Sequence, residues 1–137
     1  MTLQRIVVVI AAALAIAWLG VSYGNAHAIR HAQVVAADPH ATPAEIDAAI
    51  RDARSAHTLD PGRTESLSYV AALEIRAGRL DEARRAYEEI VRLEPDTAEA
   101  WVVLSKLTQR SDPARSAQAL EQAKRLDPLG TGAPPQR

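Results

Sequence analysis

The chain of 137 residues contains no cysteine and no phenylalanine, and aromatic residues make up only 4% of it. Without cysteine it has no disulfide, no thiolate zinc site, no cysteine nucleophile and no lipidated cysteine anchor. The scarcity of aromatic residues argues against a large aromatic-lined pocket, so we expect no cofactor. The 16 Lys and Arg residues nearly balance the 17 Asp and Glu residues. No basic field therefore favours nucleic acid as a partner.

Catalytic motifs are also missing. No nucleophile elbow accompanies the serines, and no glycine-rich loop opens a helix after a strand. His27 and His31 are four residues apart and could share a helical face, but a metal site needs a third ligand, and His40 lies beyond a proline. We interpret these histidines as polar residues of a helix and His57 as a helix C-terminal residue that complements the dipole. The sequence predicts no enzyme, no metal and no small-molecule substrate.

Residues 6–23 form the longest apolar segment, and no charged residue occurs between Arg5 and Arg30. Eighteen helical residues at about 1.5 Å each extend about 27 Å, close to the thickness of a bilayer hydrocarbon core. Trp18 and Tyr23 fall near one end, where amphipathic rings favour the headgroup zone. This segment predicts a single transmembrane helix after an N-terminal tail of residues 1–5.

A cleaved signal peptide is the alternative for the same segment. Arg5 would be its positive region, residues 6–19 its apolar region, and Ala26-His27-Ala28 its cleavage site. The apolar segment is longer than such regions usually are, which favours a retained anchor. The position of Arg5 close to the membrane favours an N-inside orientation. Both interpretations place the rest of the chain outside the cytoplasm, either as a single-pass membrane protein or as an exported soluble protein.

The rest of the chain repeats itself. Leu59-Asp60-Pro61, Leu93-Glu94-Pro95 and Leu126-Asp127-Pro128 share one pattern. Their prolines recur with a period of about 34 residues, which together with helical character predicts stacked helix pairs. Over about residues 30–128, the spacing of glycine, leucine, alanine, tyrosine and proline resembles that of the tetratricopeptide repeat (TPR) family. The residues of the best repeat that carry this resemblance are Gly78, Leu80, Ala83, Tyr87 and Pro95.

The predicted fold is all-α, an N-terminal transmembrane helix followed by a short TPR-like α-solenoid of helix-turn-helix repeats. Residues 24–41 are interpreted as a juxtamembrane helix and an irregular first half-repeat, residues 42–128 as the repeats, and residues 129–137 as a disordered tail rich in glycine and proline. The helices are expected at 25–37 (either separate from or continuous with the membrane helix), 43–58, 64–77, 80–93, 97–109 and 113–126.

Local signals support these boundaries. Thr42 and Glu45 have the spacing of a capping box, and Asp112 precedes a proline at the start of the last helix. Gly78 can leave its helix in a left-handed conformation that other residues resist. The pairs Asp47/Arg51 and Glu88/Arg92 lie four residues apart on outer helical faces, where opposite charges can pair.

The resemblance implies that the first helix of each pair lines a concave surface. Arg76 and Arg110 are one repeat apart and, with Lys106, could form a small basic spot for a carboxylate or an acidic peptide segment. Ordinary solvated side chains are the alternative, and the chain lacks the asparagines of the family's carboxylate-binding members. The candidate partner-binding residues are Glu65, Ser68, Ala72, Ile75, Arg76, Glu99, Val102, Lys106, Gln109 and Arg110.

The predicted function is a membrane-anchored TPR-like scaffold of the cell envelope that holds a peptide or protein partner on its concave face. One alternative is an accessory subunit of a larger membrane complex, in which a second helix packs against the small residues between Ala11 and Ala17. The other alternative is a secreted soluble TPR protein after cleavage of a signal peptide.

Overall fold

A computed structural model describes residues 3–128 and 130 of the chain. The predicted tail at 129–137 therefore lies outside the described residues, except for Gly130. The described part contains six α-helices and no strand. The helices are α1 Leu3–Ala37, α2 Pro43–Leu59, α3 Glu65–Arg76, α4 Leu80–Leu93, α5 Ala98–Thr108 and α6 Pro113–Leu126.

The five helices expected after residue 42 are all present, and their ends lie within one residue of the predicted ends. The helix expected at 25–37 is continuous with the preceding apolar segment, because α1 runs unbroken for 35 residues. It ends at Ala37, before Asp38 and Pro39, as expected for a residue pair that disfavours helix.

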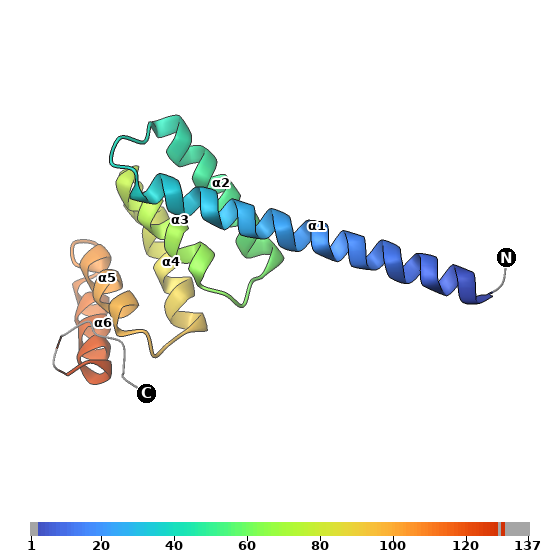
Figure 1. The fold of residues 1–137 in the computed structure, drawn as a ribbon. Helices are drawn as coiled ribbons and strands as arrows, with labels where there is room; N and C mark the ends of the chain where they lie inside the picture. Colours follow the sequence, from blue (N-terminus) through green and yellow to red (C-terminus); the bar gives the residue numbers. More distant parts are fainter. Residues whose placement is uncertain (1–2, 129, 131–137) are drawn as a thin grey trace.

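Consecutive helices pack against each other in chain order, which produces a right-to-left stack of three pairs in Figure 1. Besides α2, the helix α1 also packs against α3. Its N-terminal part projects from the stack as a single long rod (Figure 1). One buried cluster joins α1, α2, α3 and α4, and a second joins α3, α4, α5 and α6. Tyr87 of α4 packs against both clusters, so α4 connects the two halves of the core.

Helix caps form where the sequence predicts them. The Thr42 hydroxyl accepts from the backbone N–H of Glu45, and the Glu45 carboxylate accepts from the backbone N–H of Thr42. At α6, the Asp112 carboxylate accepts from the backbone N–H of Arg115 at 3.0 Å. Gly78 has φ = 75° between α3 and α4, a conformation that suits glycine because it has no Cβ. These caps explain why the sequence located the helix ends well.

Small buried residues allow the two helices of a pair to approach closely. Ala71 of α3 and Ala83 of α4 are fully buried. Ser105 and Ser116 occupy the corresponding places in α5 and α6, one repeat later, and the Ser116 hydroxyl donates to the Ser105 carbonyl at 2.8 Å. The hydroxyls are therefore satisfied inside the pair and do not weaken its packing.

The first part of α1 carries apolar side chains that face away from the stack. Val8, Ile10, Leu14, Ile16 and Trp18 each leave more than half of their surface exposed. Among the described residues, none of the helices meets the combined length and hydropathy needed to cross a membrane.

Candidate interaction surface

The ten predicted partner-binding residues lie on two helices that begin successive pairs. Five are on α3; Glu99, Val102 and Lys106 are on α5, and Gln109 and Arg110 directly follow it. All ten are exposed or half-buried. Ala72 and Val102 are half-buried, and the Ile75 side chain is 38% exposed. Each helix therefore contributes partly exposed apolar side chains between charged ones, and we call the surface of these ten residues the α3–α5 face.

Arg76 does not lie free on this face. Its guanidinium donates to the carbonyl oxygens of Val35 at 2.8 Å, Ala36 at 3.2 Å and Asp38 at 2.8 Å. The Val35 and Ala36 carbonyls belong to the last turn of α1, and Asp38 directly follows it. The Val35 carbonyl also accepts from the Asp38 N–H, and the Asp38 carbonyl from the Ala41 N–H, each at 3.3 Å. Arg76 thus caps α1 and ties it to α3, an arrangement we call the Arg76 clasp.

Lys106 and Arg110 differ from Arg76, because neither forms a hydrogen bond or an ion pair within residues 3–128. The structure therefore does not assemble all three cations into one unoccupied basic spot. The helices also differ in spacing. No Cα atom of α3 lies within 8 Å of a Cα atom of α5 in the described chain, whereas α1 and α3 do approach that closely. The backbones of α3 and α5 are thus farther apart than those of α1 and α3.

Two carboxylates lie at the opposite end of the α3–α5 face, in the first turns of α3 and α5. Glu65 pairs with Arg63 at 3.2 Å, and both side chains are largely exposed. Glu99 acts on Tyr87 of α4, whose pKa is raised first by burial of the phenol and second by the negative charge of Glu99. The charge of the face therefore changes from acidic to basic along the direction of the helices.

The sequence analysis missed a buried ionic network around Glu74 of α3. Its carboxylate is 2% exposed and accepts from Arg54 of α2 at 2.7 Å and from Arg79, in the α3–α4 turn. Arg79 also pairs with Asp47 of α2 at 2.8 Å. A signal was present in the sequence, because Glu74 lies three and four residues from the apolar positions Ala71 and Val70, on the buried stripe of α3.

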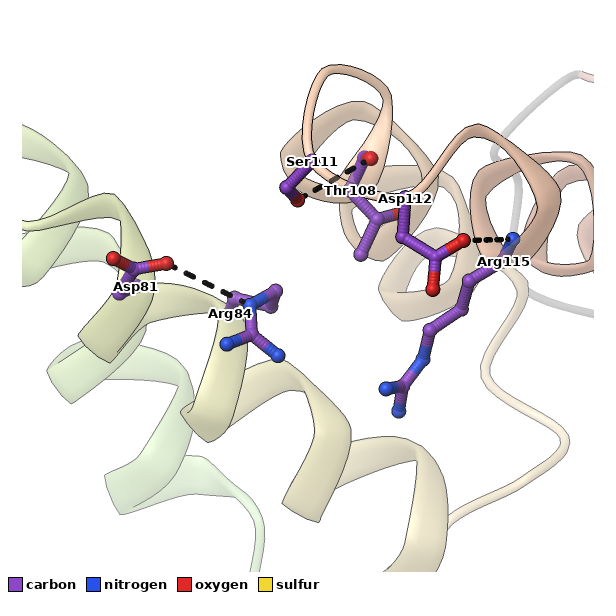
Figure 2. Close-up of a pocket in the computed structure, with 6 residues that line it drawn as sticks. All are labelled: Asp81, Arg84, Thr108, Ser111, Asp112 and Arg115. Carbon is purple, nitrogen blue, oxygen red and sulfur yellow. Dashed lines mark hydrogen bonds and ion pairs between the residues drawn. The ribbon is translucent and has the colours of Figure 1, made fainter.

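Two hollows occur at corresponding places between successive pairs. Their lining residues are Asp47, Ile50, Arg51, Arg54, Glu74, Arg79 and Glu82 in the first, and Asp81, Arg84, Thr108, Ser111, Asp112 and Arg115 in the second (Figure 2). Most residues of the second hollow lie one repeat after a residue of the first. The second encloses about 200 Å³ and carries two positive and two negative side chains, so it attracts no ion of one sign.

The ion pairs beside these hollows have opposite polarity. Arg54 of α2 lies 3.7 Å from Glu82 of α4, and Glu88 of α4 lies 3.1 Å from Arg115 of α6. Glu88 stands one repeat after Arg54, and Arg115 stands one repeat after Glu82. At the first junction, the earlier helix (α2) carries the arginine and the later helix (α4) the glutamate. At the second junction, the earlier helix (α4) carries the glutamate and the later helix (α6) the arginine.

His31 and His57 have different surroundings. His31 Nδ1 lies 2.6 Å from the Asp52 carboxylate and so connects α1 with α2. Within the described residues, no group of three histidine or acidic side chains is arranged to hold a metal ion. His57 lies in the last turn of α2, as expected, and its Nδ1 is buried without a hydrogen-bond partner in the described structure.

The comparisons with known proteins agree with this geometry. Residues 64–107, which contain α3, α4 and most of α5, match the family profile described as tetratricopeptide repeat. No curated protein matches the chain. The match supports the resemblance seen in the spacing of Gly78, Tyr87 and Pro95, and such repeats suggest a scaffold for protein–protein interaction. The segment from α3 to α5 is thus similar to a tetratricopeptide repeat and lies within an all-α stack.

Proposed function

We propose that this chain is a scaffold that holds a peptide or protein partner on the α3–α5 face. One observation carries this function: Lys106 and Arg110 are exposed and unpaired in the described structure, and Lys106 lies one helical turn after the half-buried Val102 on α5. Elsewhere the arginines mostly pair with carboxylates of neighbouring turns or helices. Desolvated apolar groups with cations at their edge can bind a partner and fix its register. This role involves no catalysis, cofactor or nucleic acid.

Site-specific photo-cross-linking in the native cells tests this function. A photoreactive residue at Gln109 should capture a discrete partner, and Lys106→Glu with Arg110→Glu should abolish the capture. The matched control reverses two exposed cations elsewhere, Arg51 and Lys124, which form no ion pair among residues 3–128, and should leave capture unchanged. Equal capture by the two double variants would contradict a role for the α3–α5 face.

The scaffold is further proposed to be anchored in a membrane by residues 6–23, with the repeats on the extracytoplasmic side of the envelope. Support comes from the absence of charge between Arg5 and Arg30 and from the exposed apolar side chains on the projecting part of α1. Alkaline extraction should leave the protein in the membrane fraction. Because the chain lacks cysteine, a single Ser55→Cys variant reports the side, and an impermeant maleimide should label it in intact cells or spheroplasts.

Two alternatives give different results in the same samples. An exported soluble protein would be released from the membrane, and its N-terminal sequence would begin near Ile29, after the Ala26-His27-Ala28 motif. An accessory subunit of a membrane complex would lose its assembly when residues 6–23 are replaced by an unrelated anchor. The exposed small residues Ala11, Ala12 and Ala13 favour this second alternative, because small residues let helices pack closely in lipid.

A further inference from the structure

The long helix α1 fixes the position of the stack relative to its own N-terminal part. Residues 24–37 continue the helix of the proposed span 6–23 without a break. Ala32 and Val35 are buried in the first cluster, and Arg76 of α3 donates to carbonyls at the end of α1. No flexible linker therefore separates the stack from the apolar segment, and each turn of the stack keeps its distance along the α1 axis.

One contact sets the register between α1 and α2. The His31 Nδ1 atom lies 2.6 Å from the Asp52 carboxylate. His31 is eight residues beyond residue 23, the end of the proposed span, which is about 12 Å along the helix. The helix α2 runs antiparallel to α1, because only the short turn 38–42 joins these two packed helices. Its last residue, Leu59, is seven residues after Asp52 and thus about 10 Å back toward the N-terminal part of α1.

The end of α2 therefore reaches the level at which the proposed span ends. We call residues 59–64 the α2–α3 turn. It extends farther along α1, toward the N-terminus, than the other turns of the stack (Figure 1). The headgroup zone of a bilayer is about 5 to 8 Å deep on each side of the hydrocarbon core. The two distances along the helices differ by less than this depth, so the α2–α3 turn falls within the headgroup zone.

The α2–α3 turn presents an apolar side chain that the described core does not use. Leu59 is 52% exposed, whereas Leu93, one repeat later, packs against the second buried cluster. The turn is also held in place, because the Thr64 hydroxyl donates to the Glu94 carboxylate at 2.6 Å. Leu59 is thus an exposed leucine at a fixed turn, on the side of the stack from which the apolar part of α1 projects.

The charges of the turn indicate which kind of lipid suits it. Arg63 lies 3.2 Å from the Glu65 carboxylate and 3.9 Å from the Asp60 carboxylate. Its guanidinium is therefore already accompanied by two carboxylates, and the three side chains together carry a net negative charge. An anionic membrane surface would repel this turn, whereas a zwitterionic surface would not.

Resting on the membrane anchor proposed above, we propose that the α2–α3 turn docks on the headgroup zone of a zwitterionic bilayer, with Leu59 entering its apolar edge. Transfer of an exposed leucine from water to this region is favourable. The turn is thus a second membrane contact besides residues 6–23, and it holds the stack in one orientation to the bilayer.

Spin labels on the full chain in phosphatidylcholine nanodiscs test the position of this turn. The chain has no cysteine, so Gly62→Cys and His40→Cys each provide a single site. A Cβ at Gly62 meets no heavy atom within 4 Å, and His40 is exposed at the opposite end of the first helix pair. Lipids with a nickel-chelating headgroup are added. We expect them to enhance relaxation of the label at residue 62 several-fold more than that of the label at residue 40.

Further variants separate docking from mere proximity. Leu59→Asp removes the apolar side chain and adds a charge, so the label at residue 62 should relax less. Leu120→Asp is the matched control, because Leu120 of α6 is also exposed but lies outside the turn, and it should leave the relaxation unchanged. Seven alanines inserted after Gly24 add about two helical turns, or about 10 Å, and should lower the relaxation at residue 62 to that at residue 40.

Several results would overturn this inference. They are equal relaxation at residues 62 and 40, no effect of Leu59→Asp, and relaxation at residue 62 that requires anionic lipid. Dipolar broadening between two labels at residue 62 would show that a second copy of the chain covers the turn instead. If any of these results occurs while alkaline extraction leaves the chain in the membrane, docking is wrong and the anchor stands. If extraction releases the chain, both are wrong.

Discussion

Glu88 of α4 and Arg115 of α6 form an ion pair of 3.1 Å between successive helix pairs, and this pair reverses the polarity of its counterpart at the preceding junction. There, α2 carries the arginine and α4 the glutamate. Helix α4 therefore contributes the carboxylate to both ion pairs, and α2 and α6 each contribute a guanidinium. This arrangement favours the observed order of pairs, because like charges would meet if α2 and α6 packed against each other through these places.

Reversing the charge of Arg115 should weaken the last junction. Arg115→Glu places a carboxylate against Glu88, which is only about one-quarter exposed, and we expect the free energy of unfolding to fall by about 1 to 2 kcal/mol. Urea denaturation of the full chain in detergent measures this change. Lys124→Glu, on the same helix but without an ion-pair partner in the described part of the chain, should change stability by less than about 0.5 kcal/mol. Equal losses in the two variants would contradict the junction role.

Removing the Glu74 carboxylate should also be costly. Glu74→Ala leaves the guanidiniums of Arg54 and Arg79 without their shared acceptor, but both remain partly exposed to water, so we expect a loss of about 1 to 3 kcal/mol. The same denaturation experiment measures it. A compensated variant tests the cause: Glu74→Leu with Arg54→Leu should recover part of the loss, because no unpaired charge then remains at α2.

The Arg76 clasp predicts a local effect. Arg76→Ala should increase hydrogen exchange of the amides near the C-terminal end of α1, from about Val34 to Asp38, because the side-chain hydrogen bonds that tie this end to α3 are lost. Arg110→Ala is the matched control, since it removes the corresponding arginine one repeat later without removing a bond within the described chain. An equal increase in both variants would show that the clasp does not hold α1.

The capping box predicts a pH dependence. Hydrogen bonds from the Thr42 hydroxyl, and then from the Thr42 backbone N–H, lower the pKa of Glu45 below its ordinary value of 4.5. The folded state thus favours the carboxylate, and the contribution to stability is present above pH 4.5 and is lost as the pH falls through the lowered value. Thr42→Ala should raise the pKa of Glu45 toward 4.5 in an NMR titration of its carboxyl carbon. An unchanged titration midpoint would count against the box.

Truncation tests whether the first pair is part of the core. A chain that begins at Thr64 should be much less stable than one that begins at Ala26. The shorter chain loses Ala32 and Val35 of the first cluster, exposes Val70 and Leu73, and removes Arg54 from Glu74. Thermal unfolding followed by circular dichroism measures the difference, and equal melting of the two chains would contradict it.

The sequence predicted the helices well because their signals are local. The period of the Leu-Asp/Glu-Pro triplets, the capping box at Thr42 and the turn at Gly78 each act within a few residues. The pairing of charges was predicted poorly for the opposite reason. Asp47 pairs with Arg79 instead of Arg51, and Glu88 pairs with Arg84 and Arg115 instead of Arg92. Arginine side chains reach acceptors on neighbouring helices, and spacing along one helix cannot reveal these.

The candidate surface also combines features that local spacing predicts with contacts that only the packing of the helices reveals. Spacing alone identified Arg76 and Arg110 as equivalent positions, because residues that are one repeat apart lie on corresponding helix faces. Only the packing of α1 against α3 showed that one arginine is occupied by carbonyls while the other is left without a partner in the described chain. The order of helices along this chain is thus a property of local residue patterns. The chemistry that each side chain offers depends on which neighbour the stack brings within reach.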